Sequence, residues 1–232
     1  MTNLEIRLLG PPDVKSGGGP VLIPRRRTRA LLFYLAATRC AHSRAHLATR
    51  FWGDASDREA GRSLSDTLYR LREALSQPAC IATRGDQIWL DRETGCWVDL
   101  VAFETRLAAA RRAGASHEAA SQALESATDL WRGTLLEGFD LPDCPEFEDW
   151  LALERQRVET LYLDALAELC ERHTRAGSPE RALHAAERLL HADPLREDAH
   201  RWLMRLRAAS GNRAVALRQY ELARAVLERE LG

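Results

Sequence analysis

Short runs in which apolar and polar side chains alternate open the chain. Residues 4–9 alternate in this way and run into Gly10-Pro11-Pro12, a pattern that predicts a strand ending in a turn. A second turn at residues 16–20 precedes the apolar residues 21–23. The pattern therefore predicts a small antiparallel sheet of short strands at the N-terminus.

Helical spacing of the apolar positions replaces this alternation after Pro24. Three helices are predicted, over residues 27–38, 43–51 and 59–75, and Ser43 is a favourable N-cap for the second of them. The third carries a stripe of leucines on one face, at positions 64, 68, 71 and 75.

Two further apolar runs, residues 80–83 and 87–90, surround Arg84-Gly85-Asp86 and predict a β-hairpin. Three helices closed by a hairpin are the arrangement of a winged helix-turn-helix. The second and third helices then form the helix-turn-helix, and the hairpin is the wing.

Alanine, leucine and glutamate dominate from residue 99 onward, and the signals for strands disappear. Six helices are predicted, over residues 101–113, 116–132, 146–176, 179–192, 195–210 and 213–231. Similar segments follow Gly177 and Gly211, which lie 34 residues apart, the period of tetratricopeptide helix pairs. The predicted fold is mainly α with a small β part: a winged helix-turn-helix domain, residues 1–98, and an all-α tetratricopeptide-like repeat domain, residues 99–232.

Charge is distributed unevenly between these two halves. The whole chain has a formal net charge of −1, but residues 1–99 carry a net +4, residues 100–232 a net −5, and residues 25–72 alone a net +7. Such a basic block is typical of a nucleic-acid or acidic-partner surface, although a solvated arginine-rich surface explains it equally well.

Composition narrows the class of protein further. With 45% apolar and 29% charged residues, the composition is that of a globular protein. The sequence shows neither a long apolar run nor a secretory signal, so a cytoplasmic location away from membranes is predicted. Five scattered cysteines without a CxxC pair predict reduced thiols. Phosphate-loop, zinc-protease, nucleophile-elbow and dinucleotide motifs are missing, and Cys170 with His173 lacks further ligands. We therefore predict no enzyme, no catalytic residue, no metal site and no cofactor.

A recognition helix buries one stripe and presents polar groups to base edges and phosphates, and the third predicted helix can do this. Arg70 could bind guanine through two hydrogen bonds, and Tyr69 could contact a phosphate or a thymine methyl group. Asp66 repels phosphate, but it could accept from cytosine or orient a neighbouring arginine. The full set of predicted DNA-binding residues is Ser43, Arg44, Arg62, Ser65, Asp66, Tyr69, Arg70, Arg72 and Arg84. Within that set, Ser43 and Arg44 open the second helix, whose free amides can meet a phosphate.

Several motifs, in this order, resemble the Streptomyces antibiotic regulatory protein (SARP) family and its bacterial transcriptional activator domain. They are Leu4 to Pro11, Phe51-Trp52-Gly53, Leu68 to Leu75, Trp131-Arg132-Gly133, and His191 to Glu197. The resemblance implies an OmpR-type winged helix followed by a tetratricopeptide-like activator domain. It also implies DNA contacts by Arg62, Arg70, Arg72 and Arg84, whereas Asp66 and Tyr69 depart from the family pattern and leave the operator sequence open.

The resemblance further implies a sequence-specific activator that binds direct repeats in promoter DNA. Such a protein recruits RNA polymerase, through its sigma or alpha subunit, to a gene cluster for secondary metabolism, and a second protomer can join it on DNA. It would associate with the nucleoid when bound. Two alternatives stay open: a tetratricopeptide-type protein-interaction module, and the regulatory segment of a larger ATPase-bearing sensor, of which this chain would be a fragment. An enzyme without a known motif is a more distant third.

Overall fold

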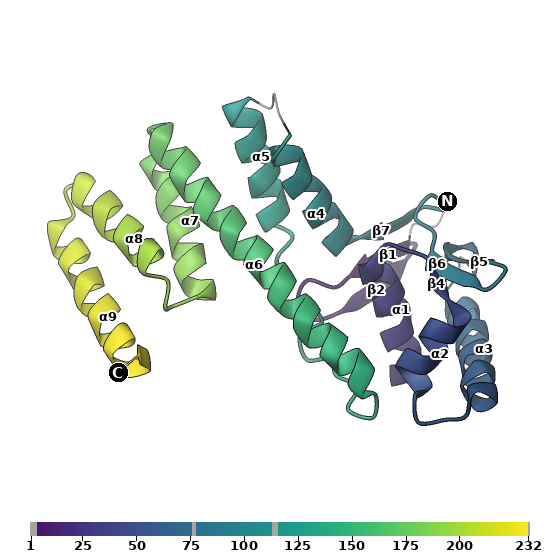
Figure 1. Cartoon of the computed structure of the whole chain (residues 1–232). Helices are drawn as coiled ribbons and strands as arrows, with labels where there is room; N and C mark the ends of the chain where they lie inside the picture. The colour runs from purple at the N-terminus through teal and green to yellow at the C-terminus, as the bar shows by residue number, and fades with distance from the viewer. Residues whose placement is uncertain (1–3, 76–77, 113–115, 232) are drawn as a thin grey trace. The chain divides into compact units, whose positions relative to one another are not determined.

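The computed structural model of the chain describes residues 4–75, 78–112 and 116–231 (Figure 1). Contacts divide the chain into two compact units. The winged unit comprises Met1–Thr105 and Leu130–Val158, and the helical unit comprises Arg106–Asp129 and Glu159–Gly232. The division follows contacts and does not test the predicted domain boundary after residue 98, which stays a prediction.

The winged unit begins with a four-stranded sheet in the order β3-β2-β1-β7. Its strands are β1 (Leu4–Arg7), β2 (Asp13–Ser16), β3 (Gly19–Pro20) and β7 (Cys96–Val98). The prediction of a purely antiparallel sheet was wrong, because β7 pairs with β1 in parallel. Residues 21–23 form no strand, although Ile23 is buried. The parallel pairing joins segments about ninety residues apart, so the local sequence pattern could not reveal it.

Three helices follow: α1 (Arg26–Thr38), α2 (Arg44–Trp52) and α3 (Asp57–Ala74). Ser43 caps α2 as predicted, since its Oγ accepts from the His46 amide at 3.1 Å. Ser56 and Glu59 form a capping box at the start of α3, a feature that was not predicted. The leucine stripe of α3 is fully buried, as predicted.

The wing is part of a second, three-stranded sheet in the order β4-β6-β5. Strands β5 (Ile81–Arg84) and β6 (Gln87–Leu90) form the predicted hairpin, preceded by a 3-10 turn, η1 (Pro78–Cys80). The short strand β4 (His42–Ser43), which the sequence analysis missed, pairs with β6 directly before α2. The winged helix-turn-helix is therefore confirmed, with the hairpin tied to the start of α2.

The helical part consists of α4 (Asp99–Ala110), α5 (His117–Thr128), α6 (Pro145–Arg175), α7 (Pro179–Ala192), α8 (Glu197–Ala209) and α9 (Arg213–Leu231). Within the helical unit, α7, α8 and α9 pack in sequence, each against the next (Figure 1). Gly177 and Gly211 adopt positive φ angles of 68° and 81° at the turns before α7 and α9. The mainly α fold with a small β part is thus confirmed.

Residues 130–158 complete the core of the winged unit. The side chains of Phe139, Phe147 and Leu151 are buried there, and the Phe139 ring meets the Phe33 ring of α1 edge to face at 5.2 Å. Asp99, the first residue of α4, ties that helix to the segment after β1, because its buried carboxylate accepts from the Leu8 and Leu9 amides at 2.7 and 3.0 Å.

No helix of the described ranges combines the length and the apolarity that spanning a bilayer demands.

Candidate nucleic-acid interface

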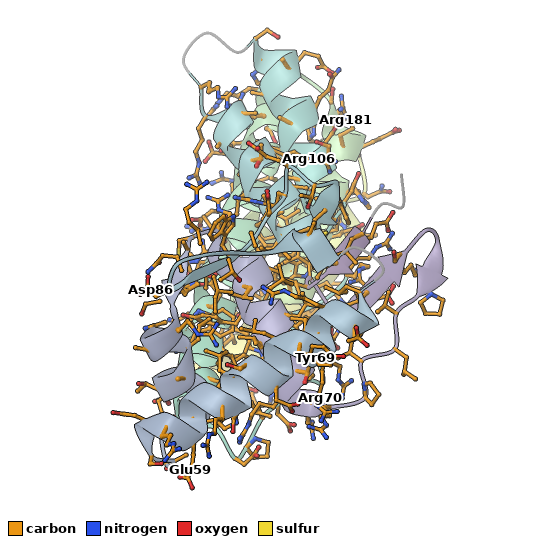
Figure 2. The ribbon with its side chains drawn as sticks, turned by 90° about the vertical axis from the view of Figure 1, so that its right-hand side faces the viewer. Glu59, Tyr69, Arg70, Asp86, Arg106 and Arg181 are labelled. Atoms are coloured by element: carbon orange, nitrogen blue, oxygen red, sulfur yellow. The ribbon has the colours of Figure 1, made fainter. Side chains whose placement is uncertain are left out.

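The outer face of α3 carries five of the predicted DNA-binding residues. Arg62, Ser65, Asp66, Tyr69 and Arg70 are all exposed there, and Tyr69 leaves 63% of its surface accessible. Figure 2 looks onto this helix, with Glu59 at one end and Tyr69 and Arg70 toward the other. The buried leucine stripe lies on the opposite face, so α3 presents polar groups where a recognition helix needs them.

Asp66 and Arg70 form an ion pair one helical turn apart. The Arg70 Nε donates to Asp66 Oδ2 at 2.7 Å, and Arg25 Nη1 approaches the same oxygen at 3.4 Å. The hydrogen bond from Arg70 holds the pKa of Asp66 below its usual value, so the carboxylate stays ionised. Of the two uses considered for Asp66, the geometry favours orienting an arginine over accepting from cytosine.

Arg44 and Ser65 connect the two helices of the helix-turn-helix. The Arg44 Nη2 donates to Ser65 Oγ at 2.5 Å, and that hydroxyl donates in turn to the Gly61 carbonyl at 2.9 Å. Both side chains therefore already have protein partners, which suits a role in holding α2 against α3.

Arg72 connects α3 to the wing. Its Nη2 donates to the Ile81 carbonyl at 3.0 Å and to Thr83 Oγ1 at 2.6 Å, and the side chain is half-buried. Arg72 is one of the predicted DNA-contact residues. The structure adds a contact that fixes the hairpin relative to the recognition helix, which no local pattern could have shown.

The start of α2 was predicted to offer free backbone amides to a phosphate, but some of these amides already have partners. The Arg44 amide donates to the Asp86 carbonyl at 2.8 Å, and the His46 amide donates to Ser43 Oγ. Asp86 lies at the tip of the hairpin (Figure 2). The wing and the N-cap thus satisfy two of the amides at this end of the helix, and the room for a phosphate is reduced accordingly.

Arg84 lies on the face of the hairpin that points away from the core. It pairs with Gln87 across the hairpin and is exposed, whereas Ile81 and Ile88 of the other face are buried. Within the described ranges, neither Arg84 nor Arg62 has a carboxylate oxygen within 4 Å of its guanidinium group.

The basic run at the start of α1, residues 25–29, has protein partners rather than free charge. Arg26 forms an ion pair with Asp140, Arg27 one with Asp143 at 2.7 Å, and Arg25 approaches Asp66. The Arg26 and Arg29 guanidinium groups also lie over the Phe139 ring, at 5.7 and 5.5 Å from its centroid. Most of these guanidinium groups therefore contact residues 139–143. Only the fold shows that this segment lies close to α1.

The comparisons with known proteins bear on both halves of the chain. Residues 98–232 match the bacterial transcriptional activator domain family. The chain belongs to this family. Among solved structures, it is similar to Mycobacterium tuberculosis EmbR in complex with a low-affinity phosphopeptide, with a TM-score of 0.73 and 24% sequence identity. That similarity covers 100% of this chain and 62% of the EmbR chain.

Comparison with curated proteins finds no match. The domain match and the shared fold confirm the resemblance to the SARP type of transcriptional regulator. The phosphopeptide belongs to the EmbR structure, and the chain spans less than two thirds of that protein.

Proposed function

We propose that this chain is a sequence-specific, double-stranded DNA-binding activator of transcription. The observation that carries the proposal is the outer face of α3, where Asp66 holds Arg70 beside the exposed Tyr69. A guanidinium group that binds a carboxylate through Nε keeps its two terminal nitrogens available, and these match the O6 and N7 acceptors of guanine. Membership of a transcriptional activator family supports this assignment.

The predicted DNA-binding residues then divide by role. Arg70 and Tyr69 contact bases or the thymine methyl group, while Arg62 and Arg84, which have no carboxylate partner in the described ranges, neutralise phosphates. Ser43, Arg44, Ser65 and Arg72 mainly hold α2, α3 and the wing in position through the bonds described above. Asp66 orients Arg70 for the base.

The wider setting follows from the family. We propose binding to direct repeats in promoters, contact of the helical part with the sigma or alpha subunit of RNA polymerase, and control of a secondary-metabolite gene cluster. A second protomer would join on the adjacent repeat, and the protein would act in the cytoplasm, at the nucleoid. A regulator of this kind needs no cofactor or catalytic residue of its own.

Selection of bound sites from random DNA by the full chain tests the proposal. We expect a recurrent motif, repeated at a spacing near one helical turn, and an affinity that falls steeply as salt rises. Recovery of unenriched sequences, or an affinity insensitive to salt, would contradict it.

A second candidate is a protein-interaction module. The exposed Leu217, Tyr220 and Leu222 of α9 favour it, because large apolar side chains outside a core are typical of interaction surfaces. In that case the selection experiment yields no motif, while substitution of these three residues still abolishes partner binding.

A further inference from the structure

A pocket of about 350 Å³ lies in the winged unit, between the C-terminal end of α1 and the hairpin β5–β6. Its apolar wall includes Leu35 of α1 together with Trp89 and Leu90 of β6. This volume falls at the lower end of the range for small-molecule sites, which runs from about 300 to 1,000 Å³. The pocket is distinct from the α3 face described above, although Arg84 borders it.

Among the residues that the structure describes, three arginines line this pocket, Arg39, Arg84 and Arg92, and no acidic residue does. Arg39 Nη1 binds Glu104 at 3.0 Å, and Glu104 also binds Arg157, so its charge is already shared. For Arg84 and Arg92, the described parts of the chain supply no carboxylate oxygen within 4 Å. The site therefore has an excess of positive charge.

One local feature opposes an anion here. The C-terminal end of α1 carries a partial negative charge of roughly half an elementary charge. The two unpaired guanidinium groups outweigh it, and a third guanidinium group lies beside them, so the balance stays positive. Arg39, which lines the pocket, follows the last residue of α1 and has a φ of 54°, the left-handed conformation that a helix end uses to turn the chain.

We propose that this pocket binds a small anion with a flat apolar body, such as an aryl phosphate or an aromatic carboxylate. The guanidinium groups bind the anionic end through charge-assisted hydrogen bonds, and the Trp89 side chain with Leu35 and Leu90 covers the apolar end. A DNA phosphate fits this arrangement less well, because it has no apolar part to cover those three side chains.

Occupancy of the pocket affects DNA binding, a consequence that rests on the proposed function. Arg84 serves both the pocket and the proposed phosphate contact, so a bound anion neutralises charge that DNA would otherwise use. Binding of the two is then mutually unfavourable by one and the same factor. We expect a saturating ligand to weaken DNA binding about threefold at constant ionic strength.

The experiment uses the full chain without DNA, so that its outcome does not depend on the proposed function. Phenyl phosphate is titrated and followed by calorimetry and by the NMR signal of the Trp89 indole, with inorganic phosphate and benzyl alcohol as separate arms. We expect saturable binding of one phenyl phosphate and at least about 10-fold weaker binding of each of the other two. Equal affinity for inorganic phosphate would show a plain anion site and overturn the proposal.

Two variants locate the binding. Arg92→Ala removes one unpaired charge, and Ala41→Trp fills the pocket from an exposed position on its rim. Each should weaken phenyl phosphate binding about 10-fold, whereas the matched controls Arg205→Ala and Ala214→Trp, both at exposed positions of the helical unit, should leave it unchanged. Unchanged affinity in both pocket variants, with folding verified by circular dichroism, overturns the assignment.

Discussion

The winged unit and the helical unit are stabilised over very different distances along the chain. Side-chain bonds in the winged unit join Asp99 to the Leu8 amide, Arg27 to Asp143, and Arg50 to the Glu146 carbonyl, separations of 91, 116 and 96 residues. In the helical unit the separations are shorter: Gln219 binds His200 at 19 residues, and Arg188 binds the Thr128 carbonyl at 60. A repeat of helix pairs buries its apolar faces against its neighbours, whereas a mixed sheet requires distant segments.

Contacts of the winged unit extend well beyond the residue at which the sequence pattern changes. Residues 130–158 follow two helices of the second half, yet they provide buried side chains and acidic partners to the first. We therefore expect the winged unit to depend on them for its stability.

The largest effect is expected from truncation after residue 99. A chain of residues 1–99 loses the burial of Phe139, Phe147 and Leu151 and the partners of Arg26 and Arg27, so it should be at least ~5 kcal/mol less stable than residues 1–158. Urea unfolding followed by circular dichroism measures this. Equal midpoints for the two truncated chains would show that the comparison between the units is wrong.

Substitution of Asp99 should have the next largest effect. Its carboxylate accepts from three backbone amides, those of Leu8, Leu9 and Leu100, and only 1% of the residue is exposed. Asp99→Ala leaves these buried donors without an acceptor and should lower the free energy of unfolding by about 3–5 kcal/mol. Asp99→Asn keeps one acceptor oxygen and should lose less; an equal loss in both variants would contradict the hydrogen-bond explanation.

Acid should weaken the winged unit through His42. Burial, together with the charges of His46 and Arg50, lowers the pKa of His42 to about 4, whereas an unfolded chain has a histidine pKa near 6.5. Between about pH 4 and 6.5 the unfolded state therefore binds more protons than the folded state. Above about pH 6.5 His42 does not lower the free energy of unfolding. As the pH drops toward 4, the free energy of unfolding falls by about 2–3 kcal/mol. His42→Gln should flatten this part of the pH profile of unfolding, and an unchanged slope would assign it to other groups.

Arg70→Ala tests the exposed face of the winged unit. Loss of this guanidinium group should cost about 1–3 kcal/mol in binding to the selected DNA site and relax the preference at one base pair. Asp66→Ala keeps Arg70 but frees its Nε, so specificity should fall more than affinity. Arg205→Ala, a control of equal charge in the helical unit, should leave the preference intact; if Arg70→Ala does so too, α3 does not read DNA.

The smallest effect is expected in the helical unit. Arg207 and Glu187 form a partly exposed ion pair at 3.0 Å between neighbouring helices. Arg207→Ala should therefore cost ~0.5 kcal/mol, measured by thermal unfolding. A loss near that of Asp99→Ala would remove the contrast between the units.

Much of the fold could be predicted because its signals are local. The leucine stripe of α3, the Ser43 cap and the glycines at the turns of the helical repeat each act over one helical turn, and the elements begin and end within a few residues of the predicted positions. The faces of helices follow from the same periodicity, so the exposed residues of α3 were predicted as a group.

Contacts between distant segments could not be predicted in the same way. The sequence shows four arginines before α1 but not that Asp140 and Asp143 neutralise two of them. It shows Arg72 and Arg84 but not that the first is bound to the hairpin while the second borders a pocket.

The sequence by itself thus determined the helices, the hairpin, the order of the two halves and the uneven charge, because periodicity and turn residues act locally. Only the tertiary structure decided which arginines remain free for a ligand. A guanidinium group is available or occupied according to the acceptors that folding brings within hydrogen-bond distance, and in the winged unit several of those acceptors come from positions about a hundred residues away.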